Sequence, residues 1–156
     1  MDEIHTTVDI EAPPETVWSV LTDFDAYPEW NPRTIITGRP TPGARLHVAP
    51  GPEAGRMPTF RPRVLRADPE SELVWRGHLW IRGLFDGEHR FTLEDRGEGT
   101  TRLVQSERFG GLLARPILRL VGAETERGFH TVNAALKARA ESLSNADPVD
   151  VAGTVT

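Results

Sequence analysis

The amino-acid sequence predicts an α+β domain in which a curved, seven-stranded antiparallel sheet wraps around one long C-terminal helix. Seven short segments alternate apolar and polar residues, which is the period of a strand with one buried face. Residues 112–142 change to the period of a helix. Short helices are predicted only after the first strand, so one long helix is left to cover the apolar face of the sheet.

The first strand and the short helices after it occupy residues 4–32. Apolar and polar side chains alternate from Ile4 to Glu11. Pro13 and Pro14 end this strand, and Pro14 falls at the start of a helix, where its missing N–H costs no hydrogen bond. Residues 24–32 contain too many prolines for a long helix, so they predict a turn or one short helical piece.

Six further strands follow, separated by turns rich in glycine and proline. The last two form an antiparallel hairpin around the turn at residues 95–99. The predicted ranges are 34–37, 45–49, 59–67, 72–81, 84–94 and 101–109.

The long C-terminal helix is predicted to end near Ser142. Ile117, Val121, Gly128 and Val132 fall on one stripe of this helix, as expected for the face that packs on a sheet. From residue 145 onward the sequence is typical of a flexible tail. The chain is therefore expected to form a single domain over residues 1–144, followed by a tail over 145–156.

The last hairpin carries polar side chains on the face that turns inward. His89 shares a face with Phe91, and Gln105 and Glu107 share a face of the next strand. A sealed core rarely buries an imidazole, an amide and a carboxylate together, because each needs a partner once it leaves water. A cavity that holds a ligand accommodates them. The sequence therefore predicts an internal cavity where the curved sheet and the helix separate.

The predicted cavity has a candidate gate and a candidate set of lining residues. The segment 50–58 is the richest in glycine and proline, so it is expected to be the most mobile loop and to lie at the cavity rim. The predicted ligand-binding residues are Trp75, Phe85, His89, Phe91, Leu103, Gln105, Glu107, Val121 and Glu124.

Three titratable residues of this set have competing interpretations. His89 is either an acid, base or hydrogen-bond donor for a ligand, or a structural histidine bonded to its neighbours. Antiparallel pairing brings Glu107 near it, either as an acid–base partner or as a merely stabilising or rim-exposed carboxylate. Glu124, on the apolar stripe of the helix, either meets the cavity or pairs with an arginine. His89 and Glu107 are the catalytic candidates.

Composition narrows the classes of partner. The net charge of -5 argues against nucleic acid or an anionic membrane as a partner. The chain has no cysteine and therefore no disulfide or thiolate metal site. His78 and His89 point to opposite faces of the sheet, and no phosphate-binding or nucleophile motif is present, so neither a metal nor a cofactor is expected.

The N-terminal residues lack the pattern of a signal peptide, and no apolar segment reaches the roughly 20 residues that span a bilayer. A cytoplasmic protein without stable membrane insertion is expected, as a monomer or weak homodimer. Lys137 is the only lysine among the basic residues, a usage typical of a GC-rich bacterial genome.

Six stretches resemble the START/SRPBCC superfamily, whose members share the helix-grip fold. Together they span residues 4–142 in the order that the family has. They are 10–18 (IEAPPETVW), 24–32 (FDAYPEWNP), 73–77 (LVWRG), 83–89 (GLFDGEH), 99–103 (GTTRL) and 107–112 (ERFGGL).

This resemblance implies binding or transport of a lipid-like or polyketide-like ligand in an internal cavity. The alternative is an aromatase/cyclase-type enzyme, for which His89 and Glu107 are the acid and base in this sequence. A third class in the superfamily is a co-chaperone-type protein–protein module, and no feature of the chain favours it. The superfamily's fold hosts several functions, and no shared catalytic motif transfers to this chain.

Overall fold

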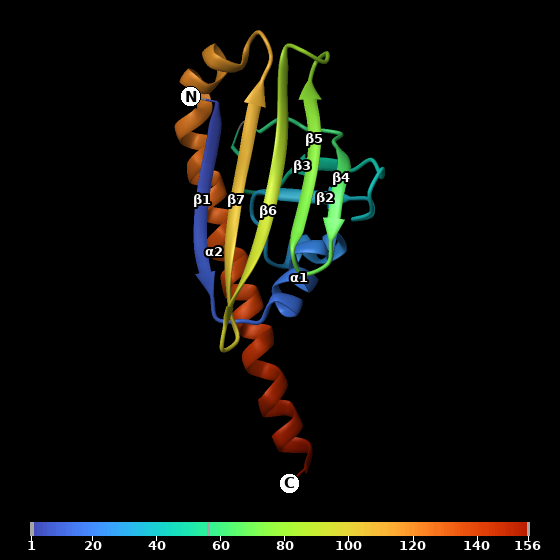
Figure 1. Ribbon diagram of the computed structural model, residues 1–156, viewed down its shortest axis with the longest axis vertical. Coiled ribbons are helices and arrows are strands. Elements are labelled where there is room, and N and C mark those ends of the chain that lie inside the picture. Colours follow the sequence, from blue (N-terminus) through green and yellow to red (C-terminus); the bar gives the residue numbers. More distant parts are fainter. Residues whose placement is uncertain (1, 56, 156) are drawn as a thin grey trace.

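A five-stranded antiparallel sheet curves along one side of a long helix, and a two-stranded sheet lies near its edge (Figure 1). The computed structural model describes residues 2–55 and 57–155, with side chains as far as residue 145. The elements are β1 (Glu3–Ile10), α1 (Pro14–Thr22), η1 (Phe24–Glu29), β2 (Thr34–Thr37), β3 (His47–Pro50), β4 (Arg63–Asp68), β5 (Glu72–Leu79), β6 (Phe85–Gly97), β7 (Thr100–Gly110) and α2 (Ala114–Val155).

The predicted α+β helix-grip class is confirmed, but the seven strands do not form one continuous sheet. The main sheet has the order β1-β7-β6-β5-β4, and β2 pairs only with β3. The strand predicted over 59–67 begins only at Arg63. Pro58 and Pro62 precede it, and a proline has no N–H to donate to a ladder. Isolated bridges, such as Val48 with Phe60, are what remain of the connection between the two sheets.

The long helix begins slightly later than the sequence predicts, and it extends further toward the C-terminus. It runs from Ala114 to Val155 rather than from about 112 to 142. No glycine, the usual helix-ending residue, occurs between Ser142 and Gly153. The helical backbone continues through this stretch although Pro148 has no N–H to donate to it. The predicted tail is helical in its backbone as far as Val155. Its side chains from 146 onward lie outside the described part, and its mobility stays a prediction.

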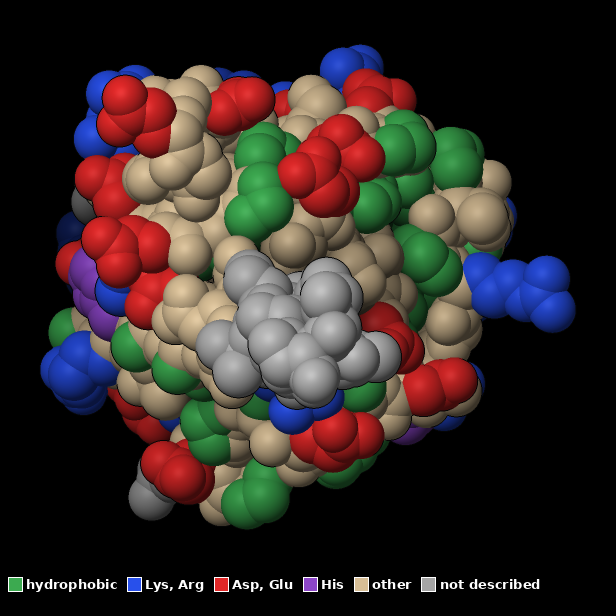
Figure 2. Space-filling view, turned by 90° about the horizontal axis from the view of Figure 1, so that it is seen from below, with side chains coloured by type: hydrophobic (Ala, Val, Ile, Leu, Met, Phe, Trp, Pro, Cys, Tyr) green, Lys and Arg blue, Asp and Glu red, His purple; other side chains and the backbone are tan. Residues whose placement is uncertain are grey.

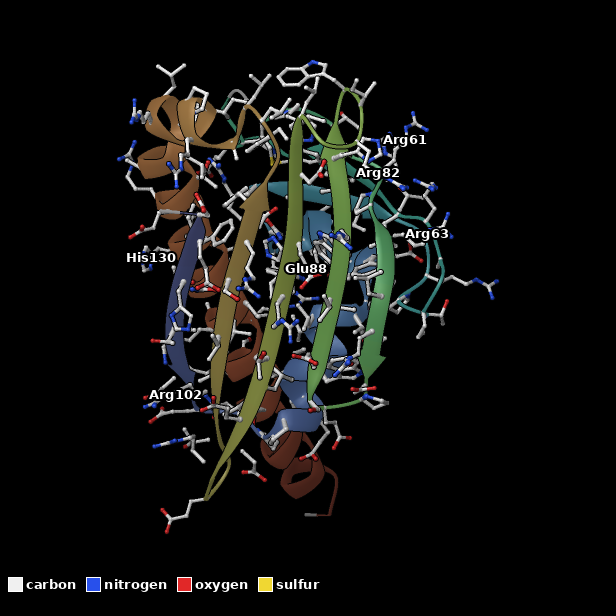
Figure 3. The ribbon with its side chains drawn as sticks, turned by 45° about the horizontal axis from the view of Figure 1, so that its top comes forward. Arg61, Arg63, Arg82, Glu88, Arg102 and His130 are labelled. Atoms are coloured by element: carbon white, nitrogen blue, oxygen red, sulfur yellow. The ribbon has the colours of Figure 1, made fainter. Side chains whose placement is uncertain are left out.

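The pairing of β6 with β7 determines which side chains face α2. His89 pairs with Glu107, Phe91 with Gln105, and Leu93 with Leu103. The alternate residues face away from α2, and Figure 3 shows Arg63, Glu88 and Arg102 on that outer face. Its charges form ion pairs, including Arg102 with Asp9 at 2.8 Å.

The hydrophobic core lies at the end where α1 and α2 approach the sheet (Figure 1). Viewed from the C-terminal end, acidic side chains predominate among the described residues, and basic side chains lie mostly at the edges of the view (Figure 2). No helix in the described ranges is both long and apolar enough to cross a membrane.

The fully buried large side chains of the core include Ile10, Val17, Leu21, Leu46, Leu73, Leu103 and Leu136.

Tyr27, in η1, is one polar member of this core. It is 2% exposed, and its hydroxyl donates to the Leu21 carbonyl at 2.5 Å. Burial, with a smaller contribution from the charge of Asp23, raises the pKa of Tyr27 well above its ordinary value of 10.0. The folded protein therefore keeps this hydroxyl protonated.

We expect the free energy of unfolding to fall as the pH rises above about 10. The neutral hydroxyl stabilises the fold fully below the unfolded pKa, and this contribution is lost at higher pH because only the unfolded chain releases the proton. Tyr27 is the only tyrosine, so tyrosinate absorbance reports this residue alone. Absorbance should rise near pH 10 in urea and at higher pH in the native protein.

The control is Tyr27→Phe, which should cost about 1 kcal/mol at neutral pH through the lost hydrogen bond. It should also weaken the fall in stability above pH 10, as measured by urea unfolding. Native tyrosinate absorbance that rises together with that of the unfolded chain would contradict the assignment.

Candidate functional site

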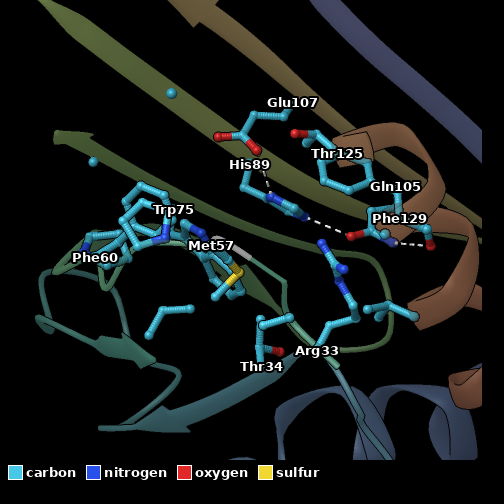
Figure 4. Close-up of a pocket in the computed structure, with 18 of the residues that line it drawn as sticks. Arg33, Thr34, Met57, Phe60, Trp75, His89, Gln105, Glu107, Thr125 and Phe129 are labelled. Atoms are coloured by element: carbon cyan, nitrogen blue, oxygen red, sulfur yellow. Dashed lines mark hydrogen bonds and ion pairs between the residues drawn. The ribbon is translucent and has the colours of Figure 1, made fainter. Parts of the chain in front are cut away.

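A cavity of about 340 Å³ lies between the concave face of the sheet and α2. Figure 4 shows side chains from the strands, from the loop before β2 and from α2 around it. The lining is mainly apolar, and one line of polar groups crosses it. Eight of the nine predicted residues line this cavity: Trp75, Phe85, His89, Phe91, Gln105, Glu107, Val121 and Glu124.

Leu103 is the predicted residue that lies outside the cavity lining. It is 0% exposed and packs in the core with Leu136 and Ala140 of α2. The sheet and α2 pack against each other at Leu103. The inward face of β7 therefore belongs to the core at Leu103 and borders the cavity only from Gln105 onward.

The central polar feature is a hydrogen-bonded line through His89. Its Nδ1 lies 3.2 Å from Glu107 Oε1, and its Nε2 lies 3.0 Å from Gln105 Oε1. Gln105 Nε2 donates to the Phe129 carbonyl at 3.2 Å. His89 and Glu107 side chains are 12% and 20% exposed. Sheet and helix thus position the imidazole together.

Two further residues complete this line below Gln105. Gln105 Nε2 donates to Asn133 Oδ1 at 2.6 Å, and Asn133 Nδ2 donates to Thr6 Oγ1 at 2.9 Å. The Thr6 hydroxyl donates to the Gln105 carbonyl at 2.9 Å, which closes a ring across β1, β7 and α2. Among the described residues, no buried side-chain nitrogen or oxygen lacks a partner, as a buried polar network requires.

The donors and acceptors determine where the protons of this line lie. The Phe129 carbonyl only accepts, so Gln105 must present Nε2 to it and Oε1 to His89. His89 therefore carries a proton on Nε2. One further proton must lie between Nδ1 and Glu107 Oε1, either on the imidazole beside a carboxylate or on a carboxylic acid beside a neutral imidazole.

Aromatic rings hold the imidazole on its faces. The ring of His89 stacks on Trp75 with centroids 5.2 Å apart, and it lies 5.0 Å from Phe129 and 4.7 Å from Phe91. Both ring nitrogens are engaged, so the imidazole has no free donor for a ligand while the line is intact. The second oxygen of Glu107 is bonded to no other described residue.

The carboxylate of Glu107 extends over Gly87, its diagonal neighbour on β6. A Cβ at Gly87 would collide with Oε2 of Glu107. Gly87 pairs with Phe109 and lines the cavity. The glycine thus gives the carboxylate room to reach His89.

The other predicted features lie at the cavity rim. Ala54, Met57 and Pro58 of the loop between β3 and β4 line the cavity, and the mobility of this loop stays a prediction. Glu124 lines the cavity and lies against the loop, since a Cβ at Gly55 would come 2.6 Å from its Oε1. Arg56, within the same loop, lies outside the described residues.

Four residues that shape the site were not predicted from the sequence: Thr6, Arg33, Phe129 and Asn133. Thr6 alternates with Ile4 and Val8, so its inward direction was readable from the strand pattern. The predicted helix stripe passes through Gly128 and Val132, one residue away from the buried Phe129 and Asn133. Nothing local in the sequence marks Arg33, which follows a proline in a loop.

The site is an apolar cavity with the hydrogen-bonded pair of His89 and Glu107 in its wall. Within the described ranges, no group of three His, Asp or Glu side chains converges as a metal site would require. Such a cavity can bind a hydrophobic ligand, and its oxygen and nitrogen groups can transfer protons.

Comparison with known proteins gives a family and a fold. A family model described as polyketide cyclase/dehydrase and lipid transport matches residues 1–141. No curated protein matches the sequence. Among solved structures, a hypothetical protein from Helicobacter pylori is similar with a TM-score of 0.74 and 14% identity, over 89% of this chain and 88% of its own.

Two other similar structures are an aromatase/cyclase and a START superfamily protein. The Zhui aromatase/cyclase from Streptomyces sp. R1128 has a TM-score of 0.69 and 23% identity, over 89% of this chain and 93% of its own. A START superfamily protein from Mycobacterium smegmatis has a TM-score of 0.69 and 22% identity, over 92% of this chain and 99% of its own. At these identities the likeness establishes the fold.

We expect NMR to find His89 protonated on Nε2, with slow exchange of that proton, because Gln105 accepts it inside the cavity wall. Long-range ¹H–¹⁵N spectra assign the tautomer. His130, whose side chain is 57% exposed, serves as the fast-exchanging control. Gln105→Leu should accelerate exchange at His89 and leave His130 unchanged. An unprotonated Nε2 in the wild type would contradict the derived hydrogen-bond line.

Proposed function

The chain belongs to the polyketide cyclase/dehydrase and lipid transport family, and we propose that it binds and carries a small hydrophobic ligand in its internal cavity. The observation that supports this proposal is the cavity of about 340 Å³, whose lining is mainly apolar. A concave, largely preformed apolar site with few polar groups is the usual form of a small-molecule site.

Magnitudes indicate which interactions set affinity. A ligand that buries about 250 Å² of apolar surface gains about 6 kcal/mol at roughly 25 cal/mol per Å². A single net hydrogen bond contributes only about 1 kcal/mol. Apolar contact therefore supplies most of the binding free energy, and the carboxylate of Glu107, whose second oxygen is bonded to no other described residue, helps to orient the ligand.

A second candidate function is an aromatase/cyclase-type reaction, favoured by the one proton between His89 and Glu107. Such a reaction joins two carbons of a poly-β-ketone chain. A base removes a proton from a CH₂ between two carbonyls, the new C–C bond forms at a ketone carbon, and an acid protonates the ketone oxygen. Loss of one water then gives the enone. A positioned pair that both accepts and donates a proton fits this sequence of steps.

We expect Val132→Trp to lower the affinity for the neutral fluorescent probe N-phenyl-1-naphthylamine by tenfold or more. Val132 lines the cavity from α2, so an indole there occupies the space that the probe needs. Fluorescence titration measures the affinity. The matched control is Val104→Trp, on the outer face of β7, which should change affinity less than twofold. Equal effects of the two substitutions would overturn the proposal.

We expect Glu107→Gln to separate the two candidate functions. The amide keeps the shape of the side chain and a hydrogen bond to His89 but holds no mobile proton. A carrier should bind N-phenyl-1-naphthylamine within twofold of the wild type. An enzyme should lose about a hundredfold or more in the rate of cyclisation of a synthetic linear poly-β-ketone thioester.

The control for this experiment is Glu88→Gln, which alters a carboxylate on the outer face of the neighbouring strand. It should leave both binding and cyclisation unchanged. A wild type that does not accelerate cyclisation over the uncatalysed rate would rule out the second candidate, and a cyclisation rate unaffected by Glu107→Gln would rule out its role as acid or base.

A further inference from the structure

Arg33 places a guanidinium in the cavity wall, where the sequence predicts only apolar and acid–base groups. It is the only lysine or arginine among the described residues that line the cavity. Figure 4 shows its side chain pointing toward Gln105 and Phe129, with Trp75 and Met57 toward the other end of the view. The cavity thus has one cationic end and one aromatic, apolar end.

A glycine in the middle of α2 makes room for this guanidinium. A Cβ at Gly128 would come 2.5 Å from Nη2, 2.8 Å from Cζ and 2.9 Å from Nε of Arg33. The planar group therefore lies against the bare helix backbone. Glycine inside a helix costs about 1 kcal/mol relative to alanine. The space that it leaves here is occupied by the guanidinium.

The backbone around Arg33 holds its side chain in place. Its N–H donates to Asn31 Oδ1 at 2.8 Å, and its carbonyl accepts from the Gly51 N–H at 2.9 Å. In the side chain, Nη1 donates to the Glu53 carbonyl at 2.9 Å. A guanidinium has five N–H donors, and no described residue accepts from Nε or Nη2.

The acidic side chains of the cavity do not neutralise this cation. Glu107 is engaged by His89, and Glu124 lies against Gly55. Neither carboxylate comes within 4.0 Å of Arg33 as an ion pair among the described residues. A partly buried guanidinium with free donors is suited to a planar oxygen anion, because its donor fork matches both oxygens of a carboxylate.

We propose that Arg33 is the anchor for an acidic ligand, a small molecule with an apolar body and one carboxylate or equally acidic enol oxygen. This inference rests on the proposed function and names the chemical class of the ligand for the same cavity. The anionic group binds the free donors of Arg33 beside Gly128. The apolar body extends along His89 toward Trp75 and Met57.

The test uses two nearly isosteric probes, 2-naphthoate and 2-naphthamide, which differ in charge. Each displaces N-phenyl-1-naphthylamine in a fluorescence competition assay. We expect the wild type to bind 2-naphthoate at least tenfold more tightly than 2-naphthamide. Arg33→Met keeps the apolar stem without the charge, so it should weaken 2-naphthoate at least tenfold and change 2-naphthamide less than twofold.

Two further variants distinguish recognition from a structural role. Gly128→Ala retains good helix propensity and displaces the guanidinium, so it should also reduce the preference for 2-naphthoate. Arg39→Met, an exposed arginine outside the cavity, should change nothing. Because Gly128→Ala leaves Arg33 itself and its backbone contacts unaltered, it tests the anchor even if Arg33→Met does not fold.

The outcomes separate this inference from the proposed function. A wild type that binds both naphthalene probes equally, or variants that weaken both probes alike, would overturn the role of Arg33 while the cavity remains a binding site. A wild type that does not bind N-phenyl-1-naphthylamine or either naphthalene probe would overturn the proposed function itself, and the inference with it.

Discussion

The register between β6 and β7 is the constraint on which the rest of the site depends. It places His89 opposite Glu107 and Phe91 opposite Gln105, so all four side chains meet on the concave face. A slip of one residue would turn the two side chains of the shifted strand outward and separate them from their partners on the other strand. Gln105 ties this register to α2 through the Phe129 carbonyl and Asn133. The bonds that orient the imidazole also fix the helix against the sheet, so stability and site geometry depend on the same contacts.

One face of β7 passes from core to cavity within a few residues. Leu103 is sealed in the core, Gln105 is buried at the boundary, and Glu107 reaches the partly open wall. Burying an amide costs free energy unless every donor and acceptor has a partner. The ring through Thr6 and Asn133 provides those partners where the sheet leaves α2. The boundary between packed core and ligand space is therefore a satisfied polar layer, which holds the two walls at a fixed spacing.

Local patterns predicted the parts of the fold and the site that depend on neighbouring residues. Strand alternation was enough to place His89, Gln105 and Glu107 on one inward face, and the family-like stretches identified the helix-grip class. The long-range parts were not accessible. Arg33 lies in the cavity because a loop before β2 packs on Gly128, a contact between residues far apart in the chain. Pro58 and Pro62 interrupt the pairing that would join the two sheets. This effect was not predictable locally, because it depends on which strand the prolines would have joined. The mobility of the loop over 50–58 remains a prediction.

The cavity has two kinds of polar group, the guanidinium of Arg33 and the pair of His89 and Glu107. They differ in whether they can transfer a proton, and this difference bears on function. A guanidinium is a permanent cation and only holds charge. In the pair of His89 and Glu107, Nδ1 lies 3.2 Å from Oε1, and the second carboxylate oxygen lies over Gly87, which lines the cavity. A ligand anchored at Arg33 would therefore lie along a group that can accept or donate a proton. If such a ligand lacks an acidic C–H near Glu107, the same geometry only orients it, and the protein acts as a carrier. If it has one, the second proposed function applies, with this pair as the acid and base. The chemistry of the ligand would therefore decide between the two proposed functions.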